Sequence, residues 1–306
     1  MLIVFTTLIL KIIPLYILIG LGYIAGRYLN ASKETVAKLL IFIITPIVIF
    51  HSVFTTPIAA NVLSLPILFF ILCCFICIVT YILTKHIWTD ATRNILAFTA
   101  GAGNTGYFGL PVALALFGTD AAGLVVLSVL GFVLYENSLG FFITARGHHT
   151  VKESIVRVLK LPTIYAFAAA LLLNMLGVKL GPIYTDFALL FRGAYTVLGM
   201  MLIGLGLSSI KNYAFDFKFV AASFTAKFIV WPIIIFSIIA LDKAFFGFFT
   251  EQIYKVMILM SIVPLAANTV AFATELKVHP EKAALAVLLS TLFALFYIPL
   301  ISVMFL

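Results

Sequence analysis

Two asparagine-threonine pairs each interrupt a long apolar stretch of the sequence. Asn104-Thr105 lies within Ala-Gly-Ala-Gly-Asn-Thr-Gly, and Asn268-Thr269 lies within Pro-Leu-Ala-Ala-Asn-Thr-Val. Glycine and proline beside the pairs favour helix breaks, because proline destabilises a helix interior by about 3 kcal/mol and frees the carbonyl one turn back. An amide side chain can cap the helix that begins after a break and still offer hydrogen-bonding groups to a ligand. Each pair therefore predicts a binding site at a broken helix.

Two ionisable residues, Glu136 and Lys227, lie deep within other apolar stretches. A charged side chain inside a membrane costs about 2.5–3.5 kcal/mol on insertion scales, so each residue is a functional candidate. Lys227 would supply positive potential for an anionic substrate, and Glu136 is a candidate proton carrier. The alternative is structural, in which the two side chains pair with each other or with backbone groups and hold the helices together.

The composition predicts that these residues lie in a bilayer. Of 306 residues, 64% are hydrophobic and 10% are charged, and the mean hydropathy is +1.24. A soluble domain has roughly 45–50% apolar and about 25% charged residues. Apolar runs of about 20 residues predict an all-α integral membrane protein and exclude a transmembrane barrel, whose strands alternate apolar and polar residues. The sequence contains no GxxxxGK[ST] loop, which excludes nucleotide-driven transport by this chain alone.

The apolar runs predict ten membrane spans. They cover residues 8–27, 36–56, 62–84, 93–117, 121–144, 155–176, 184–207, 219–241, 254–275 and 283–305. The first lacks a basic leader and a small-residue cleavage site, so we expect it to be retained. The net charge of +8 comes from Lys and Arg that gather in alternate connections, which predicts a cytoplasmic side and places both termini outside. This pattern explains the basic charge by topology, without a nucleic-acid partner.

The two halves of the chain share a pattern. Each half has five spans, and each carries its Asn-Thr pair in the fourth span of that half. Because five is odd, the second half enters the membrane from the opposite side, which predicts two inverted repeats within one transmembrane domain covering 1–306. We place the repeats at 1–145 and 154–306, with a cytoplasmic linker at 146–153. Inverted repeats are typical of secondary transporters, whose sites lie near the midplane where the halves meet.

The fourth span is the richer of the two in helix breakers. It has four glycines and a proline within eleven residues, whereas the ninth span has the single Pro264. Backbone opened in this way survives in a bilayer only where it is buried in protein or lines a wet cavity. The positive ends of the resulting half-helices would favour an anion such as a carboxylate. The alternative is that the glycines allow close helix packing and the asparagines bond across helices.

Two segments resemble a known family. Residues 104–111, Asn-Thr-Gly-Tyr-Phe-Gly-Leu-Pro, resemble the Asn-Thr-x-x-x-Gly-x-Pro segment of the auxin efflux carriers, a family of plant auxin exporters and bacterial malate or malonate permeases. Residues 272–280 resemble the family's segment between its last two helices. The resemblance implies a ten-helix transporter whose broken fourth and ninth helices cross beside the substrate. Plant members have a proline near the position of Thr269 and a long central loop; this compact chain looks more like a bacterial permease.

We therefore predict a secondary transporter of small organic anions, above all carboxylates, that works by alternating access at the crossing of the fourth and ninth helices. The alternatives are a sodium- or proton-coupled transporter of similar fold with another substrate, and a non-transporting membrane sensor. The predicted location is the bacterial inner membrane, and the resemblance suggests a homodimer. With no HExxH motif and no Asp deep in a span, we expect no enzyme, catalytic residue, metal or cofactor. The predicted substrate-binding residues are Asn104, Thr105, Gly106, Tyr107, Pro111, Pro264, Asn268, Thr269 and Asn137, with Glu136 and Lys227 as charge or proton candidates.

Overall fold

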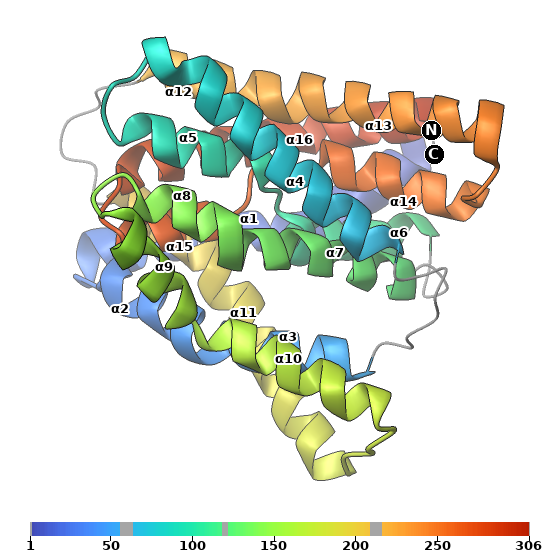
Figure 1. The fold of residues 1–306 in the computed structure, drawn as a ribbon, viewed down its shortest axis with the longest axis horizontal. Helices are drawn as coiled ribbons and strands as arrows, with labels where there is room; N and C mark the ends of the chain where they lie inside the picture. The colour runs from blue at the N-terminus through green and yellow to red at the C-terminus, as the bar shows by residue number, and fades with distance from the viewer. Residues whose placement is uncertain (1, 56–63, 118–121, 209–215, 306) are drawn as a thin grey trace.

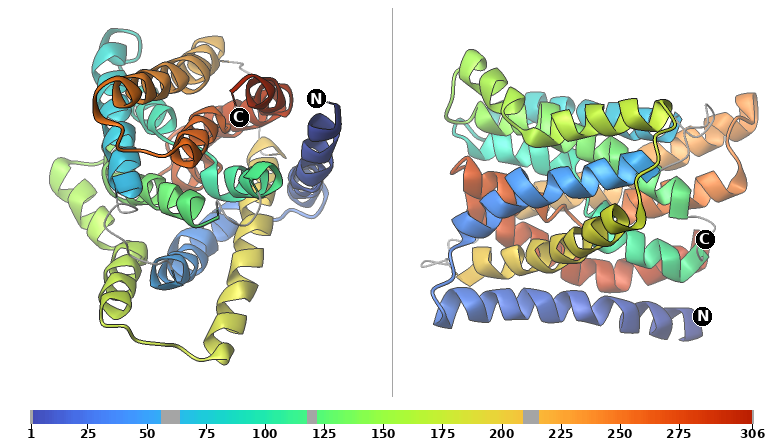
Figure 2. Two further views of the ribbon diagram at one scale, coloured as in Figure 1. Left: turned by 90° about the vertical axis from the view of Figure 1, so that its right-hand side faces the viewer. Right: turned by 90° about the horizontal axis from the view of Figure 1, so that it is seen from below.

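The computed structural model describes residues 2–55, 64–117, 122–208 and 216–305, and these residues form helices and connections without a strand. The structure does not describe the side chains of residues 2–9, 11, 12, 111, 114, 115, 122 and 123. The all-α class is confirmed. The helices run back and forth between two ends of the molecule (Figure 1), and the first helix begins at the end where the last helix finishes (Figure 2).

Each predicted span overlaps one or more helices, although the predicted limits at 56, 62 and 121 fall outside the described residues. The first half contains α1 (Leu2–Tyr28), α2 (Lys33–Leu39), η1 (Leu40–Ile44), α3 (Thr45–Thr55), α4 (Ser64–Leu83), η2 (Thr84–His86), α5 (Thr92–Gly101), η3 (Thr105–Gly109), α6 (Leu110–Phe117), α7 (Ala122–Tyr135), η5 (Glu136–Gly140) and α8 (Phe141–Ala145). The second half contains α9 (Val151–Leu159), α10 (Pro162–Met175), α11 (Pro182–Ser208), α12 (Phe217–Thr225), η6 (Ala226–Val230), α13 (Trp231–Leu241), η7 (Asp242–Phe246), α14 (Glu251–Ile262), α15 (Asn268–Glu275) and α16 (Pro280–Phe305).

Six of these helical stretches are long and apolar enough to cross a membrane. They are Lys33–Thr55, Ser64–His86, Leu124–Ala145, Pro182–Ser208, Phe217–Phe246 and Pro280–Phe305. The pair α9 and α10, bent by 48°, makes a seventh if it is taken as one span. The structure thus supports an integral membrane protein, and the count of ten spans and the inverted repeat stay predictions.

The fourth and ninth predicted spans are both broken. The helix α5 ends at Gly101, and η3 begins at Thr105, after three intervening residues. The helix α14 ends at Ile262, and α15 begins at Asn268. The two breaks touch, because the backbone N–H of Asn104 donates to the carbonyl of Pro264 at 2.8 Å.

The helices α1 and α11 lie with their backbones in direct contact. A Cβ atom on Gly22 of α1 would collide with the carbonyl of Met201, and one on Gly204 of α11 would collide with the carbonyl of Ile19. Small residues at such positions let two membrane helices approach closely, which increases their van der Waals contact. These glycines are therefore required by packing rather than by a turn.

Replacing Gly22 by alanine is expected to destabilise the protein by about 1–3 kcal/mol, the usual cost of overpacking, because the added carbon meets backbone that cannot swing away. Gly20 is a matched control on the same helix, since a Cβ there has no neighbour within 4 Å. We expect Gly20→Ala to leave thermal stability unchanged or to raise it slightly. Melting temperatures of the two detergent-purified variants test this, and equal values would contradict the close contact.

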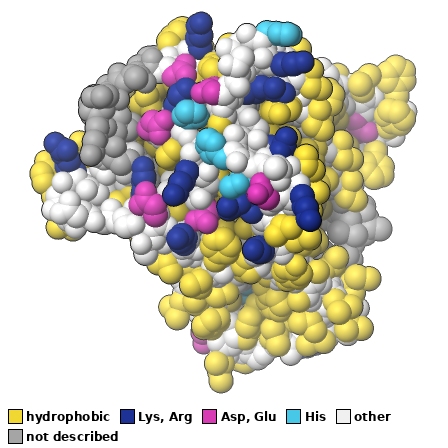
Figure 3. All heavy atoms as spheres, turned by 60° about the vertical axis from the view of Figure 1, so that its left-hand side comes forward, with side chains coloured by type: hydrophobic (Ala, Val, Ile, Leu, Met, Phe, Trp, Pro, Cys, Tyr) yellow, Lys and Arg dark blue, Asp and Glu magenta, His cyan; other side chains and the backbone are white. Residues whose placement is uncertain are grey.

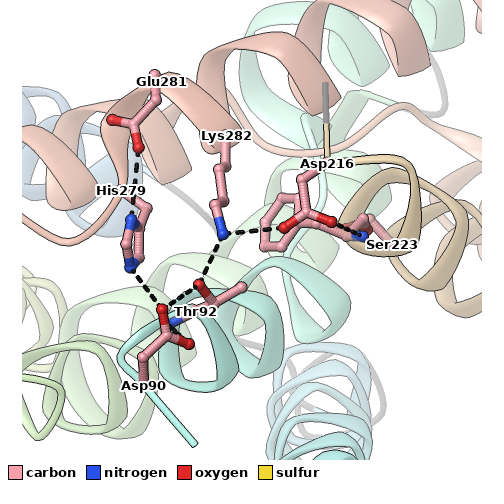
Figure 4. Close-up of polar contacts among 8 residues, drawn as sticks. Asp90, Thr92, Asp216, Ser223, His279, Glu281 and Lys282 are labelled. Atoms are coloured by element: carbon pink, nitrogen blue, oxygen red, sulfur yellow. Dashed lines mark hydrogen bonds and ion pairs between the residues drawn. The ribbon is translucent and has the colours of Figure 1, made fainter. Parts of the chain in front are cut away.

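Charged side chains gather at one end of the molecule, above flanks that are mostly hydrophobic (Figure 3). There Lys282, at the start of α16, lies 2.9 Å from Asp216 and donates to Thr92 of α5 (Figure 4). Asp216 also caps α12 by accepting from the N–H of Phe219. Partial burial opposes ionisation of Asp216, but the hydrogen bonds from Lys282 and Phe219, together with the positive charges of Lys282 and Lys218, outweigh it and lower the pKa of this carboxyl. This end carries the connections that the sequence predicts to be cytoplasmic.

Candidate functional site

A small cavity lies where the two breaks meet. Its volume is about 10 Å³, which is room for about one water molecule. The lining comes from both breaks and from α7, η5 and α11. It consists of Gly103, Asn104, Thr105, Gly106, Tyr107, Val129, Val133, Glu136, Tyr195, Ala266, Ala267 and Asn268. The structure thus brings five of the predicted substrate-binding residues (Asn104, Thr105, Gly106, Tyr107 and Asn268) and Glu136 to one place, from segments far apart in the sequence.

Asn104 presents an unused amide to this cavity. The residue is 2% exposed, and neither Oδ1 nor Nδ2 makes a hydrogen bond with any described residue. The prediction that this side chain caps the following helix is wrong, because it makes no capping hydrogen bond. Only the backbone carbonyl of Asn104 takes part, accepting from the N–H of Gly109 at 2.9 Å as the first bond of the π-helical turn. Buried polar side chains are almost always hydrogen-bonded, so the amide of Asn104 departs from the usual pattern.

Asn268 connects three other elements at the cavity. It is the first residue of α15 rather than its cap, so the predicted capping role is wrong here too. Its Oδ1 accepts from the hydroxyl of Tyr107 at 3.1 Å, and its Nδ2 donates to Glu136 at 2.7 Å and to the hydroxyl of Tyr195 at 3.4 Å. The rings of the two tyrosines lie 4.2 Å apart. Asn268 therefore bonds to side chains of other helices, as expected if the asparagines hold helices together.

Glu136 and Lys227 do not form an ion pair with each other in the described part of the chain. Glu136 begins the π-helical turn η5, is 2% exposed and accepts from Asn268. Lys227 lies in the π-helical turn η6 with its side chain fully buried, and its Nζ donates to the carbonyl of Met260 at 3.3 Å. Such π-helical turns within α-helices are frequent at functional sites. Lys227 thus pairs with a backbone group, which is one of the two structural roles considered for it.

The ends of the half-helices are arranged asymmetrically around the cavity. The N-terminal ends of η3 and α15 both line it. At the opposite ends, carbonyls of α5 and α14 are taken by donors: the indole N–H of Trp231 bonds to Ala100 at 2.8 Å, and Lys227 bonds to Met260. Because helix N-termini carry partial positive charge, the cavity is bordered by two positive ends.

The remaining predicted residues lie around the cavity without lining it. Pro264 contributes only its carbonyl, which accepts from Asn104. Thr269 is fully buried, and its hydroxyl bonds to no described residue. Pro111 is the second residue of α6, and its side chain lies outside the described part of the structure. Asn137 faces a different cavity.

That second cavity is larger and mainly apolar, with a volume of about 250 Å³. It lies between α3, α4, α7, η5 and α10, and Val133 lines both cavities. Its lining consists of Ile49, Phe70, Val133, Leu134, Asn137, Ser138, Thr163, Ile164 and Phe167. The amide of Asn137 donates to the carbonyl of Val133 at 2.9 Å. The two cavities are therefore neighbours across one side chain.

Sequence reasoning missed Tyr195, which lines the small cavity from α11. Its signal is a hydroxyl in the middle of an apolar span, one helical turn before Gly199. A Cβ on Gly199 would collide with the ring of Tyr107, so this glycine makes room for the tyrosine that bonds to Asn268. Val129 and Val133 were also missed, since nothing separates them from other valines in the sequence.

Comparisons with known proteins match both halves of the chain. A family model described as membrane transport protein matches residues 7–155, and one described as sodium bile acid symporter family matches residues 195–306. An uncharacterized transporter of Methanocaldococcus jannaschii is 28% identical over 299 residues, covering 93% of this chain and 94% of the relative. An uncharacterized transporter of Methanothermobacter thermautotrophicus is 22% identical over 300 residues, covering 95% and 96%.

Proposed function

We propose that this chain, whose residues 7–155 match the membrane transport protein model, is a secondary carrier of small organic anions, carboxylates above all. It would bind its substrate where the two broken spans meet and work by alternating access. We further propose that 1–145 and 154–306 are inverted repeats, and that the charged end of the molecule lies in the cytoplasm with both termini outside.

The free amide of Asn104 is the observation that carries this proposal. Both amide atoms of Asn104 lie at the cavity without a partner among the described residues, so a ligand that enters the cavity can bond to them. A carboxylate would accept from Nδ2, and a hydroxyl or a protonated carboxyl would donate to Oδ1. Asn268 differs in this respect, because its amide is already bonded to Tyr107 and Glu136.

The charge of the surroundings favours an anion. Two positive helix ends border the cavity, while the carbonyls that would bind a cation at Ala100 and Met260 are already occupied by donors. The ammonium group of Lys227, which lies beside Gly103 and bonds to Met260, adds positive potential. An anion bound between these groups would find compensating charge on several sides.

The volume of the cavity supports alternating access. A space of about 10 Å³ is too small for a carboxylic acid, so binding requires the helices around it to separate. The neighbouring cavity of about 250 Å³ offers space for the apolar part of a substrate if Val133 moves aside. That movement would separate α7 from α3 and α10, which form the far wall of the larger cavity.

Glu136 makes proton coupling part of the proposal. Its carboxyl lines the same small cavity as Asn104, so an ionised Glu136 would repel an anionic substrate at close range in a medium of low dielectric. Substrate binding is therefore compatible with the protonated, neutral form of Glu136. A proton taken up with each anion would make the carrier an anion–proton symporter.

Purified protein in liposomes is expected to accumulate labelled carboxylates in a saturable manner, with competition by unlabelled substrate. A panel of mono- and dicarboxylates ranks the substrates, and protein-free liposomes and a labelled quaternary amine of similar size are the controls. Binding without flux would contradict a carrier and favour the membrane sensor. Amine uptake that exceeds carboxylate uptake would contradict the anion site.

A sodium-coupled carrier is the second candidate function. It is favoured by the match of residues 195–306 to the model described as sodium bile acid symporter family. Sodium coupling would appear as carboxylate uptake that stops when choline replaces sodium outside the liposomes.

A further inference from the structure

Lys227 places an ammonium group beside both breaks. Its side chain is fully buried, and its Nζ donates to Met260 in the last turn of α14. A Cβ atom on Gly103 would lie 2.8 Å from the same Nζ, so the group also touches the break in the fourth span. The faces of Trp231 and Phe132 lie 4.7 and 5.5 Å from it, at distances where aromatic rings attract a cation.

The sequence explains why the carbonyl of Met260 has no donor within its own helix and can accept from this ammonium. In an α-helix the carbonyl of one residue accepts from the N–H four residues later. Four residues after Met260 is Pro264, which has no N–H to donate. The carbonyl therefore projects from the negative end of α14, where a positive charge is stabilised.

We propose that the Lys227 ammonium occupies the place of a coupling cation, so that this protein moves its anion without sodium. In carriers built from discontinuous helices, carbonyl ends of this kind coordinate Na⁺ or H⁺. Here a side chain of the protein itself supplies the positive charge, between the two helix breaks. The inference rests on the proposed function, since it concerns what drives that transport. Lys227 lies within residues 195–306, which match the model described as sodium bile acid symporter family, and that match by itself favours coupling to sodium.

The wild-type protein tests this without any substitution. Its melting temperature in detergent is expected to be the same in sodium, potassium and choline chloride at equal ionic strength. Carboxylate uptake into liposomes is expected to be equal with sodium or choline outside. Stabilisation specific to sodium, or uptake that requires sodium, would overturn the proposal. Because the melting experiment needs no flux, it decides the sodium question even if the protein moves no carboxylate.

If the Lys227 ammonium occupies the place of a coupling cation, removing it should leave that place open to sodium. In choline chloride, we expect Lys227→Ala to have a lower melting temperature than wild type. Sodium at ten times its dissociation constant should raise the melting temperature of this variant by about 3 °C or more. Lys227→Met fills the same space without charge and Lys227→Arg keeps the charge, so both should show no response specific to sodium. A folded Lys227→Ala that ignores sodium would overturn the proposal. If that variant does not fold, the wild-type and Lys227→Arg measurements still decide, because a sodium response in either contradicts a tethered cation.

Discussion

Replacing Asn104 by alanine is expected to lower carboxylate uptake at least tenfold while leaving the melting temperature at or above the wild-type value. Its amide makes no hydrogen bond with any described residue, so truncation breaks no hydrogen bond between described residues. Hydrogen bonds to a charged partner contribute about 1.5–3 kcal/mol, and about 1.4 kcal/mol corresponds to a factor of ten. Initial uptake rates in liposomes and thermal melting in detergent give the two values.

Asn94 is the matched control for this experiment. It lies on α5 in the same predicted span and is also buried, but its Nδ2 donates to the carbonyl of Ile143 at 2.7 Å. We expect Asn94→Ala to have the opposite profile, with a lower melting temperature and normal transport per folded molecule. Normal transport by Asn104→Ala would remove that residue from the binding site.

Glu136→Gln is expected to uncouple carboxylate movement from the proton gradient. In wild type, an alkaline interior should accelerate uptake, because each anion enters with a proton on Glu136. Glutamine has the shape of the protonated acid and keeps an oxygen for the N–H of Asn268, so the anion can still bind. The variant should therefore show uptake that does not change with the pH difference. Exchange of external labelled substrate for internal unlabelled substrate should persist.

Glu251→Gln makes the same chemical change far from the cavity. Glu251 is exposed and pairs with Lys243, and exposed ion pairs of this kind contribute little. This variant should respond to the pH gradient as wild type does. If Glu136→Gln also responds like wild type, Glu136 does not carry the coupled proton. Loss of exchange in a folded Glu136→Gln would contradict the idea that a neutral side chain is enough for binding.

The helix breaks could be predicted because their causes are local. Glycine and proline weaken helices wherever they occur, and both the break before Thr105 and the break before Asn268 follow from that chemistry. The choice of asparagine as a site residue was equally local. The capping role failed because tertiary contacts decide how these residues are placed: the backbone N–H of Asn104 bonds to Pro264 in the other break, and the amide of Asn268 bonds to Tyr107, 161 residues away.

The rest of the site depends on how distant helices meet. The freed carbonyl of Met260 follows from Pro264 alone, but its donor lies on another span 33 residues earlier. The sequence likewise holds no sign that Tyr195 approaches Tyr107, or that the space between the breaks is so small. These features come from helix positions in three dimensions, whereas periodicity reports only which face of a helix is apolar.

The small volume between the breaks also bears on leakage. A carrier driven by an ion gradient must keep that gradient from discharging while no substrate is bound. Protons cross proteins along chains of water, and a space for about one water molecule cannot hold such a chain. Val133 stands between this space and the larger apolar cavity, and apolar constrictions resist filling by water. The side chain that we expect to admit substrate would thus also insulate the resting protein against wasteful proton flow.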